Sequence, residues 1–144
     1  MIKQYIFTLI LAFITALWEI QVEGKEGWAK QLPTFRINVF FRKLLGGKPL
    51  TGYHIFLLLL FVIVFHGLFI NELGNWEIES TIFGLICWFF VIEDIMWFIF
   101  NPHYTLKKFK NKQVEWHSRW WLGLPITYWW GGIIGTLLLI FGGK

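Results

Sequence analysis

Four long runs of hydrophobic residues dominate the chain, and shorter polar segments separate them. The runs lie at about 4–22, 53–70, 82–100 and 122–141. Each has close to the roughly 20 residues that a helix needs to cross a hydrocarbon layer about 30 Å thick. Four such helices leave only short connections in a chain of 144 residues. The pattern therefore predicts an all-α integral membrane protein, with residues 1–144 forming a single domain of four transmembrane helices.

The polar segment after the first run has a periodicity of its own. Its apolar positions follow one face of a helix and comprise Ile37, Phe40, Phe41, Leu44 and Leu45. We therefore predict an amphipathic helix at 34–45, lying in the cytoplasmic interface of the membrane. The same segment also alternates as a strand would, through Phe35, Ile37, Val39 and Phe41. The helix is preferred because an open strand edge at a membrane surface leaves backbone groups unpaired.

Composition supports the membrane class. Hydrophobic residues make up 56% of the chain and charged residues 15%, against about 25% charged residues in an ordinary soluble domain. The net charge of +4 comes from basic residues that flank hydrophobic runs, so it predicts orientation in a membrane and no nucleic-acid partner. Cys87 is the single cysteine, which excludes an intrachain disulfide.

The distribution of basic residues predicts the orientation of the chain. Eleven of the thirteen Lys and Arg residues lie in the segments 21–50 and 102–121, and none lies between the second and third runs. Segments rich in Lys and Arg stay in the cytoplasm. We therefore predict that segments 21–50 and 102–121 are cytoplasmic and that both termini lie outside the cytoplasm.

The fourth run is rich in glycine and tryptophan. Gly131 and Gly135 form a GxxxG pattern that suits close helix contact, either within the chain, which we favour, or in a homo-oligomer. Tryptophans near the predicted cytoplasmic interface match the usual aromatic belt and comprise Trp18, Trp28, Trp116, Trp120 and Trp121. Tryptophans within the runs either pack between helices or line a pocket for an apolar substrate, and comprise Trp88, Trp129 and Trp130.

Acidic residues and histidines gather at the cytoplasmic end of the predicted bundle. Ionisable groups in a bilayer cost about 2.5–3.5 kcal/mol each on insertion scales, so their presence requires a reason, either functional or structural. Every run or its flank supplies some of these groups, which are Glu19, Glu23, His54, Glu93, Asp94, His103, Glu115 and His117. The fourth histidine, His66, lies toward the opposite side and is interpreted as a packing or hydrogen-bonding residue.

Carboxylates and imidazoles in this combination are typical ligands of divalent metals. In helical bundles such donors hold iron, manganese or zinc, in some proteins as a pair of ions. The leading hypothesis is a membrane metalloenzyme that acts on a lipid-like or aromatic substrate. Two alternatives stay open: a small transporter or relay for protons or cations, and a structural or assembly protein. In the last case, the acids would pair with basic residues such as Arg36, Arg42 or Arg119.

Overall fold

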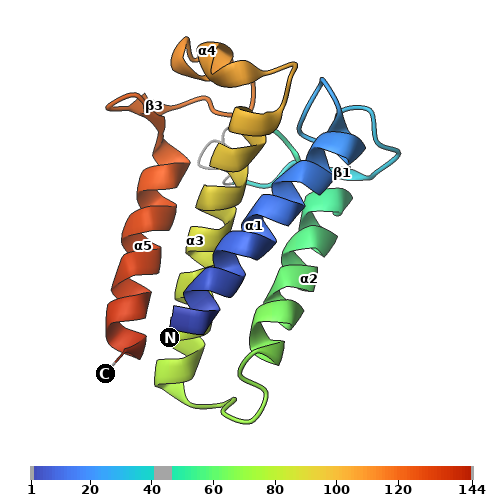
Figure 1. The fold of residues 1–144 in the computed structure, drawn as a ribbon. Helices are drawn as coiled ribbons and strands as arrows, with labels where there is room; N and C mark the ends of the chain where they lie inside the picture. Colours follow the sequence, from blue (N-terminus) through green and yellow to red (C-terminus); the bar gives the residue numbers. More distant parts are fainter. Residues whose placement is uncertain (1, 41–46, 144) are drawn as a thin grey trace.

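The structure is a computed structural model that describes residues 2–40 and 47–143. Four long helices run side by side, with α3 in contact with each of the other three (Figure 1). The helices are α1 (Ile2–Glu23), α2 (Gly52–Gly67), α3 (Trp76–Phe100) and α5 (Ile126–Gly142), with the short α4 (Thr105–Lys110) before the last of them. Both termini lie at one end of the bundle, and α4 with the longer connections lies at the other (Figure 1).

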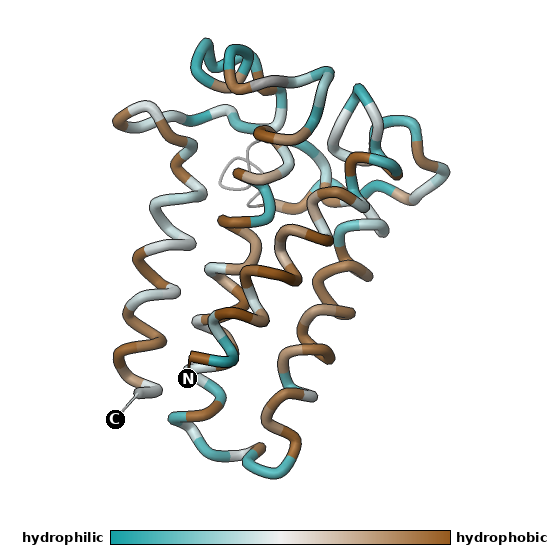
Figure 2. The backbone as a smooth tube through the Cα atoms, viewed as in Figure 1, coloured by the Kyte–Doolittle hydropathy of each residue, from teal (hydrophilic) through white to brown (hydrophobic). Residues whose placement is uncertain are grey.

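Two of the helices are long and apolar enough to cross a membrane. These are α1, with 22 residues, and α3, with 25. The other two are also apolar but shorter, with 16 residues in α2 and 17 in α5. Hydrophobic colour follows all four helices and polar colour gathers at the two ends (Figure 2). The predicted runs are thus helical for most of their length.

Helix boundaries differ from the hydrophobic runs at three places. Helix α3 begins at Trp76, six residues before the run predicts, because the Asn75 side chain accepts a hydrogen bond from the amide of Glu77 and caps the helix. Helix α2 ends at Gly67, and the residues after it form turns. Helix α5 begins only at Ile126, since the residues before it form a hairpin.

Two short antiparallel ladders depart from the predicted all-α architecture. One pairs β1 (Arg36–Ile37) with β2 (Leu50–Thr51), and the other pairs β3 (Trp120–Trp121) with β4 (Leu124–Pro125). The second ladder turns through Leu122 and Gly123, both with positive φ, as a two-residue hairpin requires.

The predicted interfacial helix at 34–45 is wrong for residues 34–40, which contain β1 and no helix. The physical reason is that β2 pairs with this segment, so the strand has a partner and its backbone groups are satisfied. The rest of the predicted helix falls within residues 41–46, which lie outside the described residues.

The glycines of α5 pack against α3 within the chain. A Cβ at Gly135 would lie 3.0 Å from Cys87 Cβ and 3.2 Å from the carbonyl oxygen of Gly84. At Gly131 a Cβ would lie 2.7 Å from Val91 Cγ2. The GxxxG pattern therefore serves the intramolecular contact that we favoured, and a homo-oligomer, which stays a prediction, would have to use another face of α5.

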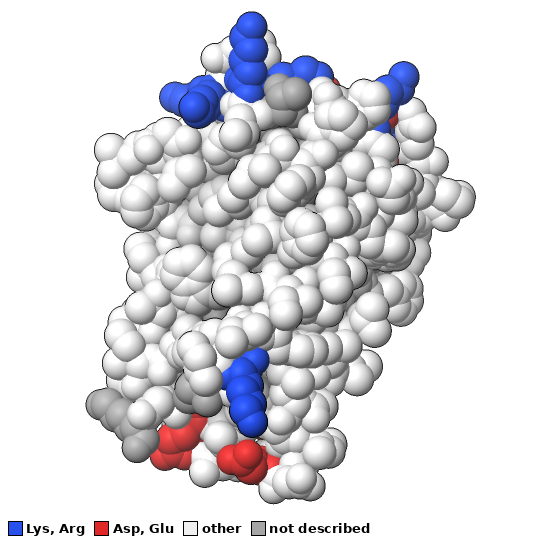
Figure 3. Space-filling model, in the orientation of Figure 1, with Lys and Arg blue, Asp and Glu red and all other residues white. Residues whose placement is uncertain are grey.

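Apolar side chains of the helices also cover much of the outer surface. Examples that are about half exposed or more occur on α1, α2 and α5, and include Ile6, Ile14, Phe56, Ile63, Ile134 and Ile140. The visible face is uncharged between its two ends, with basic side chains around α4 and acidic ones near the termini (Figure 3). Exposed apolar surface of this extent is typical of surfaces that contact a membrane or another protein.

Candidate functional site

A cavity of about 410 Å³ lies at the end of the bundle that carries the longer connections. Side chains from α1, α2, α3 and α5 line it, together with Trp28, Trp116 and His117 from the connections. Six of the eight residues predicted for the site are in its wall, namely Glu19, Glu23, His54, Glu93, Asp94 and His117. The four helices and two connections thus bring together groups that are almost a hundred residues apart in sequence.

The two other predicted residues lie on the surface. Glu115 forms an ion pair with Lys48 at 2.9 Å, and this ammonium group holds the pKa of the Glu115 carboxyl below its usual value. His103 is exposed, and its backbone amide donates to the side chain of Asn101 while its carbonyl accepts from Lys108. His66 makes the hydrogen bonds expected of it, to the Val62 carbonyl and to Glu79 at 3.1 Å.

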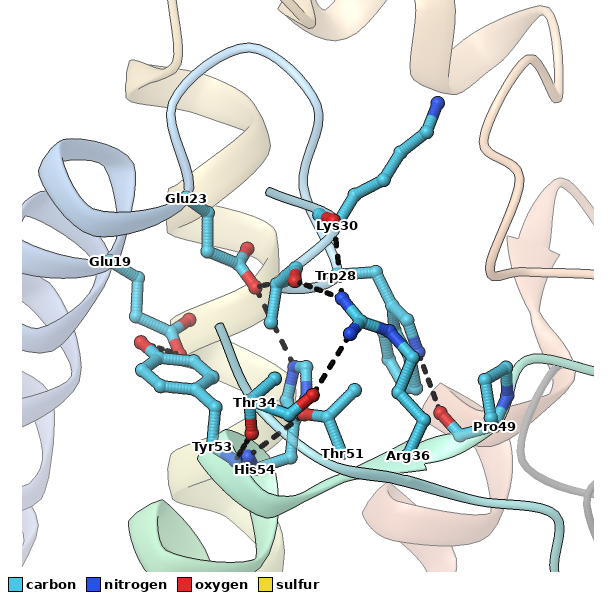
Figure 4. Close-up of polar contacts among 11 residues, drawn as sticks. Glu19, Glu23, Trp28, Lys30, Thr34, Arg36, Pro49, Thr51, Tyr53 and His54 are labelled. Atoms are coloured by element: carbon cyan, nitrogen blue, oxygen red, sulfur yellow. Dashed lines mark hydrogen bonds and ion pairs between the residues drawn. The ribbon is translucent and has the colours of Figure 1, made fainter. Parts of the chain in front are cut away.

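The first group of contacts in the cavity joins α1 to the start of α2. The hydroxyl of Tyr53 donates to Glu19 Oε1 at 3.0 Å, and Glu23 Oε1 lies 3.7 Å from His54 Nε2 (Figure 4). Glu19 and Glu23 share a face of α1 because they are one turn apart. The hydroxyl of Thr51 accepts from the His54 amide and lies 2.6 Å from His54 Nδ1. If this hydroxyl donates to Nδ1, the ring proton is on Nε2, which faces Glu23.

A tight loop after α1 completes this side of the cavity. Gly24, Gly27, Trp28 and Ala29 all have positive φ, which is uncommon for the last two. The strained turn brings the Ala29 amide to Glu23 Oε1 at 2.6 Å and stacks Trp28 on His54 with ring centroids 4.4 Å apart. Strain of this kind collects at functional sites, where packing elsewhere holds the unfavourable conformation.

A second group of contacts joins α3 to α5 and the connection before it. Asp94 Oδ2 accepts a hydrogen bond from the hydroxyl of Tyr128 and lies 3.0 Å from His117 Nε2. If Nε2 donates to the Asp94 carboxylate, Nδ1 is the basic atom of a neutral His117 ring. Asp94 thereby fixes the orientation of His117.

Glu93 and Asp94 point to different sides of α3, as neighbours about 100° apart on a helix must. Glu93 is only 6% exposed, and its carboxyl group and that of Glu19 are close enough to repel each other when both are ionised. Two carboxylates at that range need a shared proton or a cation between them. Glu93 Oε1 has no hydrogen-bond partner among the described residues.

Two further polar atoms at the cavity wall lack partners among the described residues. They are the indole nitrogen of Trp97, a side chain only 2% exposed, and the hydroxyl of Thr127. Buried polar groups are almost always hydrogen-bonded, because leaving one unpaired costs about 1–3 kcal/mol. Three unpaired atoms around one cavity therefore indicate a ligand that satisfies them.

Among the described residues, no ion pair joins a lysine or arginine to an acid of the cavity. Arg36 donates instead to the carbonyls of Ala29, Lys30 and Thr34 (Figure 4). Within residues 2–40 and 47–143, both ion pairs made by lysine join surface groups, Lys30 with Glu26 and Lys48 with Glu115. Arg42 lies outside the described residues. For the part that the structure describes, the predicted structural pairing with basic residues is not found.

Metal coordination is not preformed in the described part of the chain. No group of three or more His, Cys, Asp or Glu side chains there is arranged to hold a metal ion. Glu19, Glu23 and Asp94 instead have tyrosine, backbone or histidine partners at short range. The donor types that the sequence predicted are gathered around one cavity, but as hydrogen-bonded pairs.

Several residues of the cavity were missed or misjudged by sequence reasoning. Tyr53 and Tyr128 bind the acids but carry no charge, so no insertion cost drew attention to them. Trp28 and Trp116, interpreted as interface residues, line the cavity, while Trp129 and Trp130, which were pocket candidates, do not. Trp129 donates to the Trp121 carbonyl and Trp130 is 52% exposed.

Comparison with models of protein families, with curated proteins and with solved structures finds no match for this chain. The assignment of function therefore rests on the geometry of the cavity.

Proposed function

We propose that this protein is a four-span membrane enzyme that performs acid–base chemistry on an amphiphilic substrate held in the cavity. The observation that carries the proposal is the set of six acidic and histidine side chains around one apolar-walled cavity, with Glu93 buried and short of a donor. Its volume of about 410 Å³ is in the range of sites for small molecules. A purely structural role gives no reason to keep such a costly arrangement.

The residues divide into a base and an acid. His117, oriented by Asp94, takes a proton from the substrate through its free ring nitrogen, and Asp94 stabilises the imidazolium that results. The Glu19 and Glu93 pair holds one proton between two carboxyl groups and acts as the acid that donates this proton to the substrate. Tyr53 donates a hydrogen bond to Glu19 and Tyr128 donates one to Asp94, so each tyrosine holds one of these carboxyl groups in place.

A divalent metal at the same site is the second candidate. The four carboxylates and two imidazoles of the cavity are the donors that iron, manganese and zinc prefer, and a cation between Glu19 and Glu93 would remove their repulsion. Binding would require side chains to turn away from their present hydrogen-bond partners, since no metal-ready group is found in the described residues. The acid–base function needs no such rearrangement.

A relay across the membrane has less support. The wall between the cavity and the far end is an apolar cluster that includes Phe61, Phe65, Leu85 and Phe89. Two of the described groups beyond it, His66 and Glu79, bind each other. A proton would have to pass the apolar cluster without a described carboxylate or imidazole to carry it, since the buried polar side chains there are hydroxyls such as Thr15 and Thr81.

The test of the proposed function uses the purified protein in nanodiscs made with a polar lipid extract. We expect lipid mass spectrometry to show a substrate lost and a product gained with the wild type, and neither with Glu93→Gln. Glu72→Gln, the same change at an exposed acid near the far end, is the control and should keep the activity. Metal content is measured on the same samples. Conversion by a protein without stoichiometric metal supports acid–base chemistry, activity that depends on bound metal supports the second candidate, and no conversion contradicts both.

The proposed orientation makes a separate prediction. Segments 21–50 and 102–121 carry eleven basic residues, so we expect them on the cytoplasmic side, together with the cavity. A cysteine placed at Asn75 in a Cys87→Ala background should react with an impermeant maleimide added to intact cells, and one at Asn111 should not. The opposite pattern would reverse the orientation and place the cavity at the outer leaflet.

A further inference from the structure

We infer that the cavity binds a long-chain primary amine in its protonated form, with an oxygen atom close to the amine and a hydrocarbon tail that reaches the lipid. This inference rests on the proposed function and names the class of its substrate. Three features carry it: the charge of the wall, the unpaired polar atoms and the place where the cavity meets the outer surface.

The charge of the wall selects a cation. Four carboxylic acids line the cavity, and its described lining includes no lysine or arginine. A phosphate, sulfate or carboxylate head group would meet these acids without a compensating cationic side chain, which low polarity makes costly. A pair of carboxyl groups that shares one proton still carries one negative charge, and an ammonium group beside Glu19 and Glu93 balances that charge.

The unpaired atoms decide which cation. Glu93 Oε1 lacks a donor, and a primary ammonium group supplies three N–H donors, whereas a quaternary ammonium group supplies none. The indole N–H of Trp97 lacks an acceptor and lies on the same helix, one turn beyond Glu93. A hydroxyl or carbonyl oxygen next to the amine is therefore the complementary group. Thr127, which both donates and accepts, can bind either part of the head group.

The size and the opening of the cavity favour an amphiphile over a bare ion. A volume of about 410 Å³ far exceeds what a single cation fills, and much of the wall is apolar, from Leu50, Leu57, Phe90 and Val91. Leu58 belongs to the wall and is 45% exposed on α2, so the cavity reaches the outer surface of the bundle there. A hydrocarbon tail that leaves past Leu58 enters the lipid that the exposed side chains of α2 face in the proposed orientation.

The experiment compares four probes with the same eight-carbon chain, binding to the protein in nanodiscs. They are octylamine, octyltrimethylammonium, octanol and octyl sulfate, each corrected for partitioning into protein-free nanodiscs. We expect octylamine to bind at least tenfold more tightly than the other three, and Glu93→Gln to remove that preference, since a charged hydrogen bond is worth roughly 10- to 100-fold in affinity. Glu72→Gln should leave the preference for octylamine unchanged. Equal binding of octyltrimethylammonium or octyl sulfate would overturn the inference, as would an octylamine preference that survives in Glu93→Gln.

A second comparison tests the oxygen atom. 2-Amino-1-octanol should bind the wild type more tightly than octylamine, and Trp97→Phe should abolish the difference while octylamine binding persists. The contact to Trp97 is contradicted if 2-amino-1-octanol binds the wild type no more tightly than octylamine does. It is also contradicted if 2-amino-1-octanol still binds more tightly than octylamine in Trp97→Phe. The outcome is separable from the proposed enzyme function. Lipid conversion without octylamine binding overturns the substrate class alone, and octylamine binding without lipid conversion overturns the enzyme function alone.

Discussion

Replacement of Asp94 by asparagine is expected to slow lipid conversion by about 10²- to 10⁴-fold, the usual contribution of a positioned acid or base. Asp94 Oδ2 accepts from both Tyr128 and His117 in the structure. An asparagine amide cannot stabilise the imidazolium that forms when His117 takes a proton, and its NH₂ group favours the wrong ring tautomer. The measurement is the initial rate of product formation in nanodiscs, with the melting temperature recorded for each variant.

Non-additivity separates this role from general damage to the fold. If Asp94 acts through His117, then Asp94→Asn combined with His117→Gln should be no slower than the slower single variant. Tyr128→Phe, which removes one donor to Asp94 and keeps the ring, should have a smaller effect than either. Rates that fall in proportion to loss of folded protein, or that multiply in the double variant, would contradict the assignment.

The largest expected effect on stability comes from Gly135→Ala. The new methyl group would lie 3.0 Å from both Cys87 Cβ and Trp88 Cδ1 and 3.2 Å from the Gly84 carbonyl oxygen. These atoms belong to the α3 backbone and to side-chain carbons close to it, so α3 and α5 must move apart. Overpacking of this kind costs about 1–3 kcal/mol. We expect a lower melting temperature and a smaller free energy of unfolding, measured by denaturant titration in detergent micelles.

The chain offers a matched control for this variant three residues away. A methyl group at Gly132 would meet only Trp88 ring atoms, at 3.7 and 3.8 Å, which is ordinary contact. Gly132→Ala should therefore gain up to about 1 kcal/mol from the better helix propensity of alanine. Equal effects of the two substitutions would show that α5 does not pack on α3 through Gly135.

Much of the site could be predicted from local chemistry. Glu19, Glu93 and Asp94 stand within or at the edge of long apolar runs, and the cost of burying charge there is enough to identify them. The rule that basic segments share one side placed His54 and His117 at the same end as these acids. The same reasoning grouped His103 and Glu115 with these residues, but neither lines the cavity, because residues in a connection can turn outward to water at no cost.

The incorrect prediction of a helix for residues 34–40 has a similar cause. A short segment with apolar residues at mixed spacing fits a helix or a strand equally well, and only the presence of β2 as a partner for Arg36 and Ile37 decides for the strand. The hairpin from Trp120 to Pro125 was likewise hidden in an apolar run, since Gly123 is its one conventional turn residue.

The sequence by itself determined the four long helices, where charge enters them and which end of the bundle collects the acids. Those properties follow from hydrophobicity and helical spacing, which act along the chain. Only the tertiary structure decided that Glu93 meets Glu19 while Asp94 meets His117 and Tyr128. Such pairs depend on the rotation of each helix about its axis, and that rotation is set by contacts such as Gly135 against Gly84, which no local pattern contains.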